Sequence, residues 1–317
     1  MKKIFALLLS AALLVTLLAA CGGGNTTDTD TDTQEPAADA STTQVEEQEP
    51  DTGDASKDDP LNQDEIGEKE LLVVSFGTSY NDSRRETIGA IEKAMQTAFP
   101  DYSVRRAFTS QIIIDHVKDR DGVTIDNVEQ ALERAVNNGV KTLVVQPTHL
   151  MNGLEYEELT DELAKYSDSF EKIAIGDPLL TSDADFEAVM TAITDATKDA
   201  ADGKTAICFM GHGTTADSNS VYSKMQTLLT DKGFNDYYVG TVEATPSLDD
   251  VLAAVQKGNY EKVILRPLMI VAGDHANNDM AGDEDDSWKS MFTASGLFDS
   301  VDCQIMGLGR MEAVQQL

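Results

Sequence analysis

The sequence is poor in cysteine, in aromatic residues and in basic side chains, and each shortage excludes a class of protein. It has 317 residues with 3 cysteines and 6% aromatics, and 24 Lys and Arg stand against 56 Asp and Glu. Three cysteines are too few for a small secreted domain held together by disulfides. A formal charge of −32 argues against nucleic-acid binding, because a phosphate backbone requires a basic surface. The acidity fits either the gathering of metal cations or a well-solvated surface.

The N-terminus carries a targeting signal. Lys2 and Lys3 precede an almost wholly apolar run, Ile4 to Leu18, and Cys21 follows two alanines. A run of this length with small residues before a cysteine is typical of a secretory signal rather than a membrane-spanning helix. We predict a lipoprotein signal peptide over residues 1–20 and a lipid on Cys21, with an ordinary signal peptide as the alternative. The expected location is extracytoplasmic, anchored to the cell membrane.

Residues 21–68 are predicted to form an acidic, disordered linker behind this anchor. The segment consists mostly of Thr, Asp, Glu, Gln, Pro and Ala and has almost no large apolar side chains. Such a composition cannot offset the entropy cost of ordering the chain. Cys208 and Cys303 lie in apolar, strand-like runs and are interpreted as buried hydrophobic residues.

After residue 68, short apolar runs alternate with amphipathic segments, which predicts an α/β fold with parallel sheets covered by helices on both faces. The chain also repeats itself: the segment Val74–Thr78 matches Met210–Thr214, and two further matches follow in the same order. We therefore expect two similar Rossmann-like lobes, residues 69–185 and residues 186–317. The last residues of the second lobe are expected to pack back on the first.

The repeat also indicates where the chemistry lies, because ligands in open α/β sheets bind beyond the carboxyl ends of the strands. At these ends the second lobe places three polar residues where the first lobe places two aromatics and one carboxylate. The matched pairs are Phe76 with His212, Phe108 with Glu243, and Glu155 with His275.

Two imidazoles and a carboxylate form a suitable ligand set for a divalent ion such as Co²⁺, Ni²⁺, Fe²⁺ or Zn²⁺. The same groups can accept protons near neutral pH, and aromatic residues suit a flat apolar macrocycle. His149 also follows a predicted strand and is a candidate for binding metal or substrate. The segment Gly211–Ala216 fits the dinucleotide pattern G-x-G-x-x-A, but this short pattern is weak evidence on its own, so we expect no nucleotide.

These residues lie in segments that resemble a known family. From about Leu71 to Gly309 the chain is similar to the anaerobic sirohydrochlorin cobaltochelatases, which are class II chelatases related to ferrochelatase. The segments that carry the resemblance include LLVVSFGTSYNDSRRETIGAIE, VVQPTHLMNGLEYEEL, FMGHGT, VGTVEATPSLDDV and LMIVAGDHANNDMAGDEDDSWK.

The resemblance implies a two-lobed chelatase fold and assigns roles to individual residues. The metal ligands of the family fall on His212, Glu243 and His275, and a glutamate near the tetrapyrrole falls on Glu155. His149 stands where the family also has histidine. The chain departs from the family after Gly307-Leu308-Gly309, where Gly-Glu-Asn-Pro and a longer closing helix are usual, so a short final helix is expected.

The expected activity is ATP-independent insertion of Co²⁺, or of Fe²⁺ or Ni²⁺, into a tetrapyrrole such as sirohydrochlorin. In this hypothesis His212, Glu155 and His275 are catalytic, and Phe76, Phe108 and His149 contact the tetrapyrrole. The alternative is a lipoprotein that captures haem, a corrinoid or a metal ion for an importer without turnover, and removal of iron from haem is a third hypothesis. A homo-oligomer is compatible with the sequence.

Overall fold

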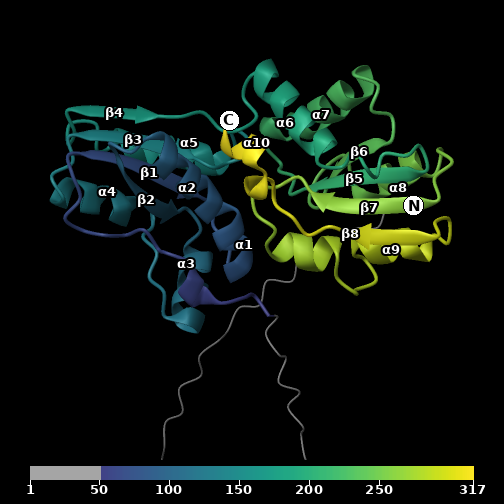
Figure 1. The fold of residues 1–317 in the computed structure, drawn as a ribbon, viewed down its shortest axis with the longest axis horizontal. Helices are drawn as coiled ribbons and strands as arrows, with labels where there is room; N and C mark the ends of the chain where they lie inside the picture. The colour runs from purple at the N-terminus through teal and green to yellow at the C-terminus, as the bar shows by residue number, and fades with distance from the viewer. Residues whose placement is uncertain (1–50) are drawn as a thin grey trace, which may run out of the picture. The chain divides into compact units, whose positions relative to one another are not determined.

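The computed structural model describes residues 51–317, which fold around two four-stranded parallel sheets (Figure 1). The predicted signal peptide and the linker up to residue 50 lie outside the described residues. The first sheet has the order β2-β1-β3-β4 and the second the order β6-β5-β7-β8. The strands are β1 (Lys69–Ser75), β2 (Ser103–Phe108), β3 (Thr142–Pro147), β4 (Lys172–Ile175), β5 (Thr205–Gly211), β6 (Tyr237–Thr241), β7 (Lys262–Pro267) and β8 (Ser300–Cys303). The predicted α/β class with two similar lobes is confirmed.

Helices connect successive strands, and several of them begin at a capping side chain. Side chains of Asn127, Ser182 and Ser247 form capping boxes at the starts of α4, α6 and α8. The helices are α1 (Asn81–Glu86), α2 (Ile88–Ala98), α3 (Gln111–Asp121), α4 (Val128–Asn137), α5 (Leu154–Ala164), α6 (Asp183–Asp195), α7 (Ser220–Asp231), α8 (Leu248–Val255), α9 (Trp288–Ala294) and α10 (Glu312–Gln315). Four single turns complete the described part: η1 (Ala55–Lys57), η2 (Asp217–Asn219), η4 (Leu308–Arg310) and the π-helical η3 (Ala276–Met280).

The two sheets share topology and register. In the first sheet Val74 of β1 pairs with Pro147 of β3, and in the second Met210 of β5 pairs with Pro267 of β7. The carboxyl ends of all four strands meet at one edge of each sheet, because every neighbouring pair is parallel. In Figure 1 the strand arrows of the two sheets point toward each other, so these two edges face one another.

One of the predicted equivalences is wrong by two residues. Ala107 pairs with Val74 in the first sheet, and Gly240 pairs with Met210 in the second, so the counterpart of Phe108 is Thr241. The counterpart of Glu243 is Ser110: the N–H of Ser110 donates to the carbonyl of Phe76, as the N–H of Glu243 donates to that of His212. The sequence match lay at the strand starts, where local similarity does not determine which residues pair.

Residues 51–68, which we call the N-terminal strap, pack on the first lobe. The Asp58 carboxylate is buried and pairs with Arg84 at 2.6 Å and with Arg106 at 2.7 Å. Leu61 joins a core cluster with Leu71, Val73 and Val104. The prediction that the disordered linker extends to residue 68 is therefore wrong, because this part of it provides a buried carboxylate and an apolar side chain to the first lobe.

Helix α6 belongs to the core of the second lobe, where Phe186 and Val189 cluster with Phe209 and Tyr237. The predicted lobe boundary at residues 185 and 186 therefore falls inside α6, and the second lobe begins before it. The turn η4 lies against the first lobe, where Arg310 pairs with Glu86 at 2.9 Å, whereas Val314 of the last helix, α10, packs in the core of the second lobe. Within residues 51–317, none of the helices has the length and apolar character needed to span a bilayer.

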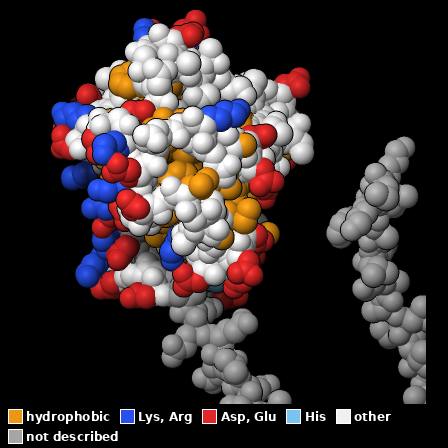
Figure 2. Space-filling view, turned by 90° about the vertical axis from the view of Figure 1, so that its right-hand side faces the viewer, with side chains coloured by type: hydrophobic (Ala, Val, Ile, Leu, Met, Phe, Trp, Pro, Cys, Tyr) orange, Lys and Arg blue, Asp and Glu red, His pale blue; other side chains and the backbone are white. Residues whose placement is uncertain are grey.

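Charged side chains of both signs surround an area of exposed hydrophobic side chains on the face shown in Figure 2. On this face the acidic residues are scattered rather than gathered into one patch. This distribution fits the interpretation of the excess negative charge as a solvated surface.

Candidate metal site

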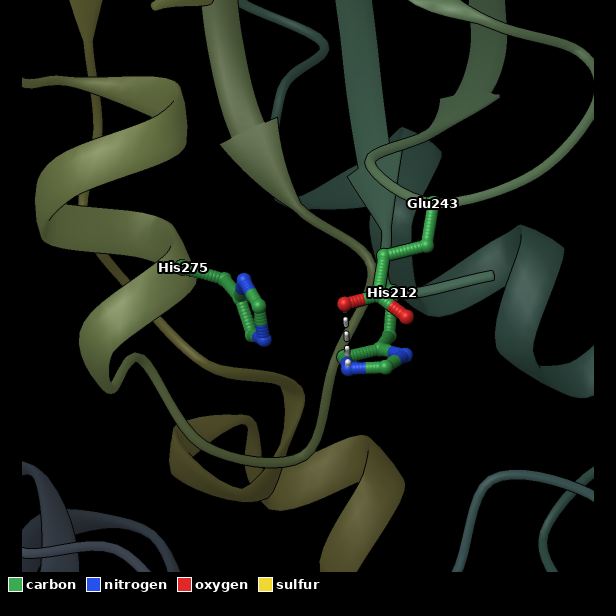
Figure 3. Close-up of side chains that lie close together, drawn as sticks. All are labelled: His212, Glu243 and His275. Atoms are coloured by element: carbon green, nitrogen blue, oxygen red, sulfur yellow. Dashed lines mark ion pairs between the residues drawn. The ribbon is translucent and has the colours of Figure 1, made fainter. Parts of the chain in front are cut away.

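Three side chains of the second lobe converge on one point (Figure 3). One ligand atom each from His212, Glu243 and His275 lies within 4.8 Å of the other two. The Nε2 atom of His212 is 3.9 Å from Oε1 of Glu243, and the two imidazole rings stand edge to face with centroids 4.5 Å apart. These separations are short enough for all three side chains to bind one ion with small adjustments, since metal–ligand bonds are about 2.0 to 2.2 Å long.

The site is open to solvent, and its ligand atoms can be assigned. The side chains of His212, Glu243 and His275 are 48%, 57% and 33% exposed, so an ion can reach them. The Nδ1 atom of His212 lies 2.7 Å from the carbonyl oxygen of Gly213. A carbonyl only accepts, so Nδ1 carries the proton and Nε2 keeps the lone pair that a metal requires.

The loops after β5 and β6 fix His212 and Glu243 relative to one another. The N–H of Glu243 donates to the carbonyl of His212 at 2.9 Å, which links the two loops directly. Gly213 has a φ of +89°, and a Cβ at this position would lie 2.9 Å from the backbone nitrogen of Ala244. The glycine is therefore required both by its backbone conformation and by the close approach of the neighbouring loop.

His275 follows a loop that contacts both lobes. The N–H of Ala272 donates to Oγ of Ser83 in α1 at 3.0 Å, and the Asn277 amide donates to the carbonyl of Gly273 at 2.7 Å. In the turn that follows His275 in the chain, the side chains of Ala276 and Met280 are fully buried. His275 is thus placed by packing in the second lobe and by a hydrogen bond to the first.

Comparison with known proteins identifies the family. Residues 69–317 match the protein family described as cobalt chelatase (CbiK). The chain belongs to the cobalt chelatase family.

Two relatives support the assignment over most of the chain. The sirohydrochlorin cobaltochelatase of Salmonella typhimurium is 36% identical over 249 residues, which are 78% of this chain and 93% of that protein. The sirohydrochlorin cobaltochelatase CbiKC of Nitratidesulfovibrio vulgaris is 32% identical over 231 residues, 72% and 81% of the two chains. SirB of Bacillus subtilis, solved with Fe³⁺, is 16% identical with a TM-score of 0.55 and covers 79% of this chain and 94% of its own, so it shows the shared fold.

The first lobe of this cobalt chelatase contributes different side chains at the facing edge. Phe76, the counterpart of His212, follows β1 and is 48% exposed, so its ring is available for contact. Phe108 has no exposed surface and packs with Ile88, Ile114 and Val117. The prediction that Phe108 contacts a tetrapyrrole is therefore wrong for this structure, and the register explains why: Phe108 corresponds to the buried Thr241 and not to Glu243.

Glu155 and His149 lie in and before the first turn of α5, apart from the three converging residues. Glu155 is exposed, and a Cβ on Gly153 would lie 3.6 Å from its Oε2 and 3.7 Å from Oγ of Ser218 in the second lobe. Both ring nitrogens of His149 are buried without a hydrogen-bond partner in the described part of the chain. Burial lowers the pKa of His149, although the charge of Glu155 acts in the opposite direction. His149 is therefore a neutral imidazole with a free lone pair.

Two features of the site escaped the sequence analysis. Asp279 hydrogen bonds to His275, and its spacing of four residues, one helical turn, is the signal that could have identified it. The other feature is a pair of exposed apolar side chains beyond the ends of β2 and β3. Ile112 is 82% exposed and Leu154 is 57% exposed. Position alone could not reveal that exposure, because many apolar residues at such positions fold inward.

Proposed function

We propose that this chain inserts Co²⁺ into sirohydrochlorin without nucleotide hydrolysis. The two relatives described above carry the name of that activity, at 36% and 32% identity. The observation that carries the proposal is the convergence of His212, Glu243 and His275 at an exposed strand edge. Two imidazole nitrogens and a carboxylate suit Co²⁺ as a substrate, and they also suit Fe²⁺ and Ni²⁺.

The residues divide the work of the reaction. The three converging side chains would bind the ion and replace part of its hydration shell before transfer. Insertion of a dication into a neutral tetrapyrrole releases two protons from pyrrole nitrogens. The exposed carboxylate of Glu155 is available as an acceptor, and the imidazole of His149 would accept the second proton once its buried ring nitrogens become accessible. The exposed ring of Phe76 offers an apolar contact to the macrocycle.

A spectroscopic assay tests the proposal. Purified protein at sub-stoichiometric concentration is mixed with sirohydrochlorin and Co²⁺, Fe²⁺ or Ni²⁺, and the absorption change of the tetrapyrrole is followed. We expect many turnovers, and we expect His212→Ala to reduce the rate at least about 100-fold, as is usual for the loss of a key catalytic group. An unchanged rate in a folded His212→Ala variant would contradict the proposed site.

The second candidate function is capture without turnover, and the N-terminal sequence favours it. We propose that Cys21 carries a lipid and holds the protein outside the cytoplasm, where haem, a corrinoid or a metal ion could be passed to an importer. The same assay separates the two functions: a spectral change that stops at one equivalent of protein supports capture. Replacing Cys21 by Ser should move the protein from the membrane fraction to the soluble fraction of the cells.

A further inference from the structure

The hydrogen bond between His275 and Asp279 points to a role for Asp279 in the metal site. Nδ1 of His275 lies 2.8 Å from Oδ2 of Asp279. A carboxylate accepts from the ring N–H, so Nδ1 carries the proton and Nε2 is left as the metal-binding atom. The same nitrogen is left free in His212, but there a backbone carbonyl accepts the proton.

We propose that Asp279 is a positioning residue that fixes the ring orientation and the tautomer of His275 for metal binding; the proposal rests on the function proposed above. Asp279 is not itself one of the converging ligands, because the cluster of ligand atoms within 4.8 Å comprises His212, Glu243 and His275. It therefore acts through His275.

The local backbone supports this role. Asp279 lies in η3, a five-residue π-helical turn, and π-helical turns occur frequently at functional sites. The buried side chains of Ala276 and Met280 fix the turn to the second lobe. The carboxylate is thus carried by a fixed piece of backbone, although its side chain is 42% exposed.

The comparison between the two histidines gives the proposal a further consequence. When a carboxylate accepts the ring N–H, the opposite ring nitrogen becomes a stronger electron-pair donor to a metal than when a backbone carbonyl accepts it. His275 should therefore be the ligand that depends on a partner side chain, whereas His212 depends only on the backbone.

Cobalt binding by the full chain, measured without tetrapyrrole, tests the proposal. Calorimetry would give the Co²⁺ affinity, and the visible absorption bands of bound Co²⁺ would report its coordination. We expect Asp279→Ala to weaken binding about 10- to 100-fold and to alter these bands. Asp279→Asn should recover part of the affinity, because its amide oxygen can still accept from Nδ1.

Asp274→Asn is the matched control, since Asp274 lies on the same loop and, among residues 51–317, accepts a hydrogen bond from the Asn278 amide alone, at 2.7 Å. It should bind Co²⁺ as the unaltered protein does. Wild-type affinity and bands in Asp279→Ala would overturn the positioning role. Absence of Co²⁺ binding in the unaltered protein would instead overturn the metal site itself. His275→Ala separates the two outcomes, because it should lower the Co²⁺ affinity wherever the metal site is correct, whether or not Asp279 positions the ring.

Discussion

The two lobes have the same strand order and register but differ in what they bury. Among the described residues, the first lobe buries six charged side chains in its core, whereas the second buries only Arg266; the six are Glu70, Arg84, Glu92, Arg105, Arg106 and Asp126. The second lobe instead has an apolar core and places its ionisable groups at the exposed edge. The same backbone arrangement therefore accommodates buried charged side chains in the first lobe and exposed candidate metal ligands in the second.

The buried charges of the first lobe form two paired networks. Arg106 binds both Glu92 and Asp58, each at 2.7 Å, and Arg105 binds Glu70 and Asp126 at 3.2 and 3.0 Å. Buried ions are costly to desolvate, and their loss is costly mainly when one partner is left alone. The largest losses of stability should therefore follow when one partner of a buried ion pair in the first lobe is replaced.

Replacing Asp58 by Ala should produce the largest effect. The variant leaves Arg84, which has no exposed surface, without a carboxylate, and we expect unfolding to become easier by about 3 to 5 kcal/mol. Urea denaturation measures this change. Asp64→Ala is the control, because Asp64 lies in the same strap but forms an exposed pair with Arg134 and should cost less than about 1 kcal/mol. Equal effects in the two variants would remove the distinction between buried and exposed pairs.

Glu70→Gln should change how stability depends on pH. Burial raises the pKa of Glu70 to about 7, against the attraction of Arg105. A carboxyl whose pKa is raised by folding favours the native state at low pH, and this contribution is lost as pH rises from about 4.5 to 7. The unaltered protein should therefore lose about 3 kcal/mol relative to the variant across that interval.

Thermal or urea unfolding at several pH values tests the prediction. Glu68→Gln, which removes an exposed carboxylate paired with Lys141, is the control and should change stability by less than about 1 kcal/mol across the same interval. Parallel profiles for Glu70→Gln and the unaltered protein would show that Glu70 stays charged when folded.

Phe76→Ala should have the smallest effect and should sharpen the contrast with His212, its counterpart in the second lobe. Loss of the exposed ring should raise KM for the tetrapyrrole about fivefold, which corresponds to about 1 kcal/mol of apolar contact. Co²⁺ affinity without tetrapyrrole should not change. Phe99→Ala is a matched control, because Phe99 is equally exposed, at 48%, but lies at the end of α2. A lower Co²⁺ affinity in Phe76→Ala would contradict the assignment of metal and macrocycle to different lobes.

The sequence predicted the fold and the cluster of metal-type residues better than it predicted which residues are exposed. Alternating patterns and the repeat were sufficient for two parallel sheets, and His212, Glu243 and His275 converge where parallel strands end. The error at Phe108 arose because sheet register depends on backbone pairing across strands. The strap was misjudged because its composition is that of a disordered segment, and only Arg84 and Arg106, distant in sequence, give Asp58 a buried partner. Asp279 was not predicted because its spacing of four residues from His275 indicates a hydrogen bond only where the segment is helical, and the sequence did not predict the turn η3.

The attachment of the strap also determines how a mechanical load would enter the domain. A pull on the chain at residue 51 would first strain the hydrogen bond from the Asp82 N–H to the Thr52 carbonyl, and then the ion pairs of Asp58. Both connections lie in the first lobe. The strand edge that carries His212 and Glu243 belongs to the second lobe and takes no part in these two connections.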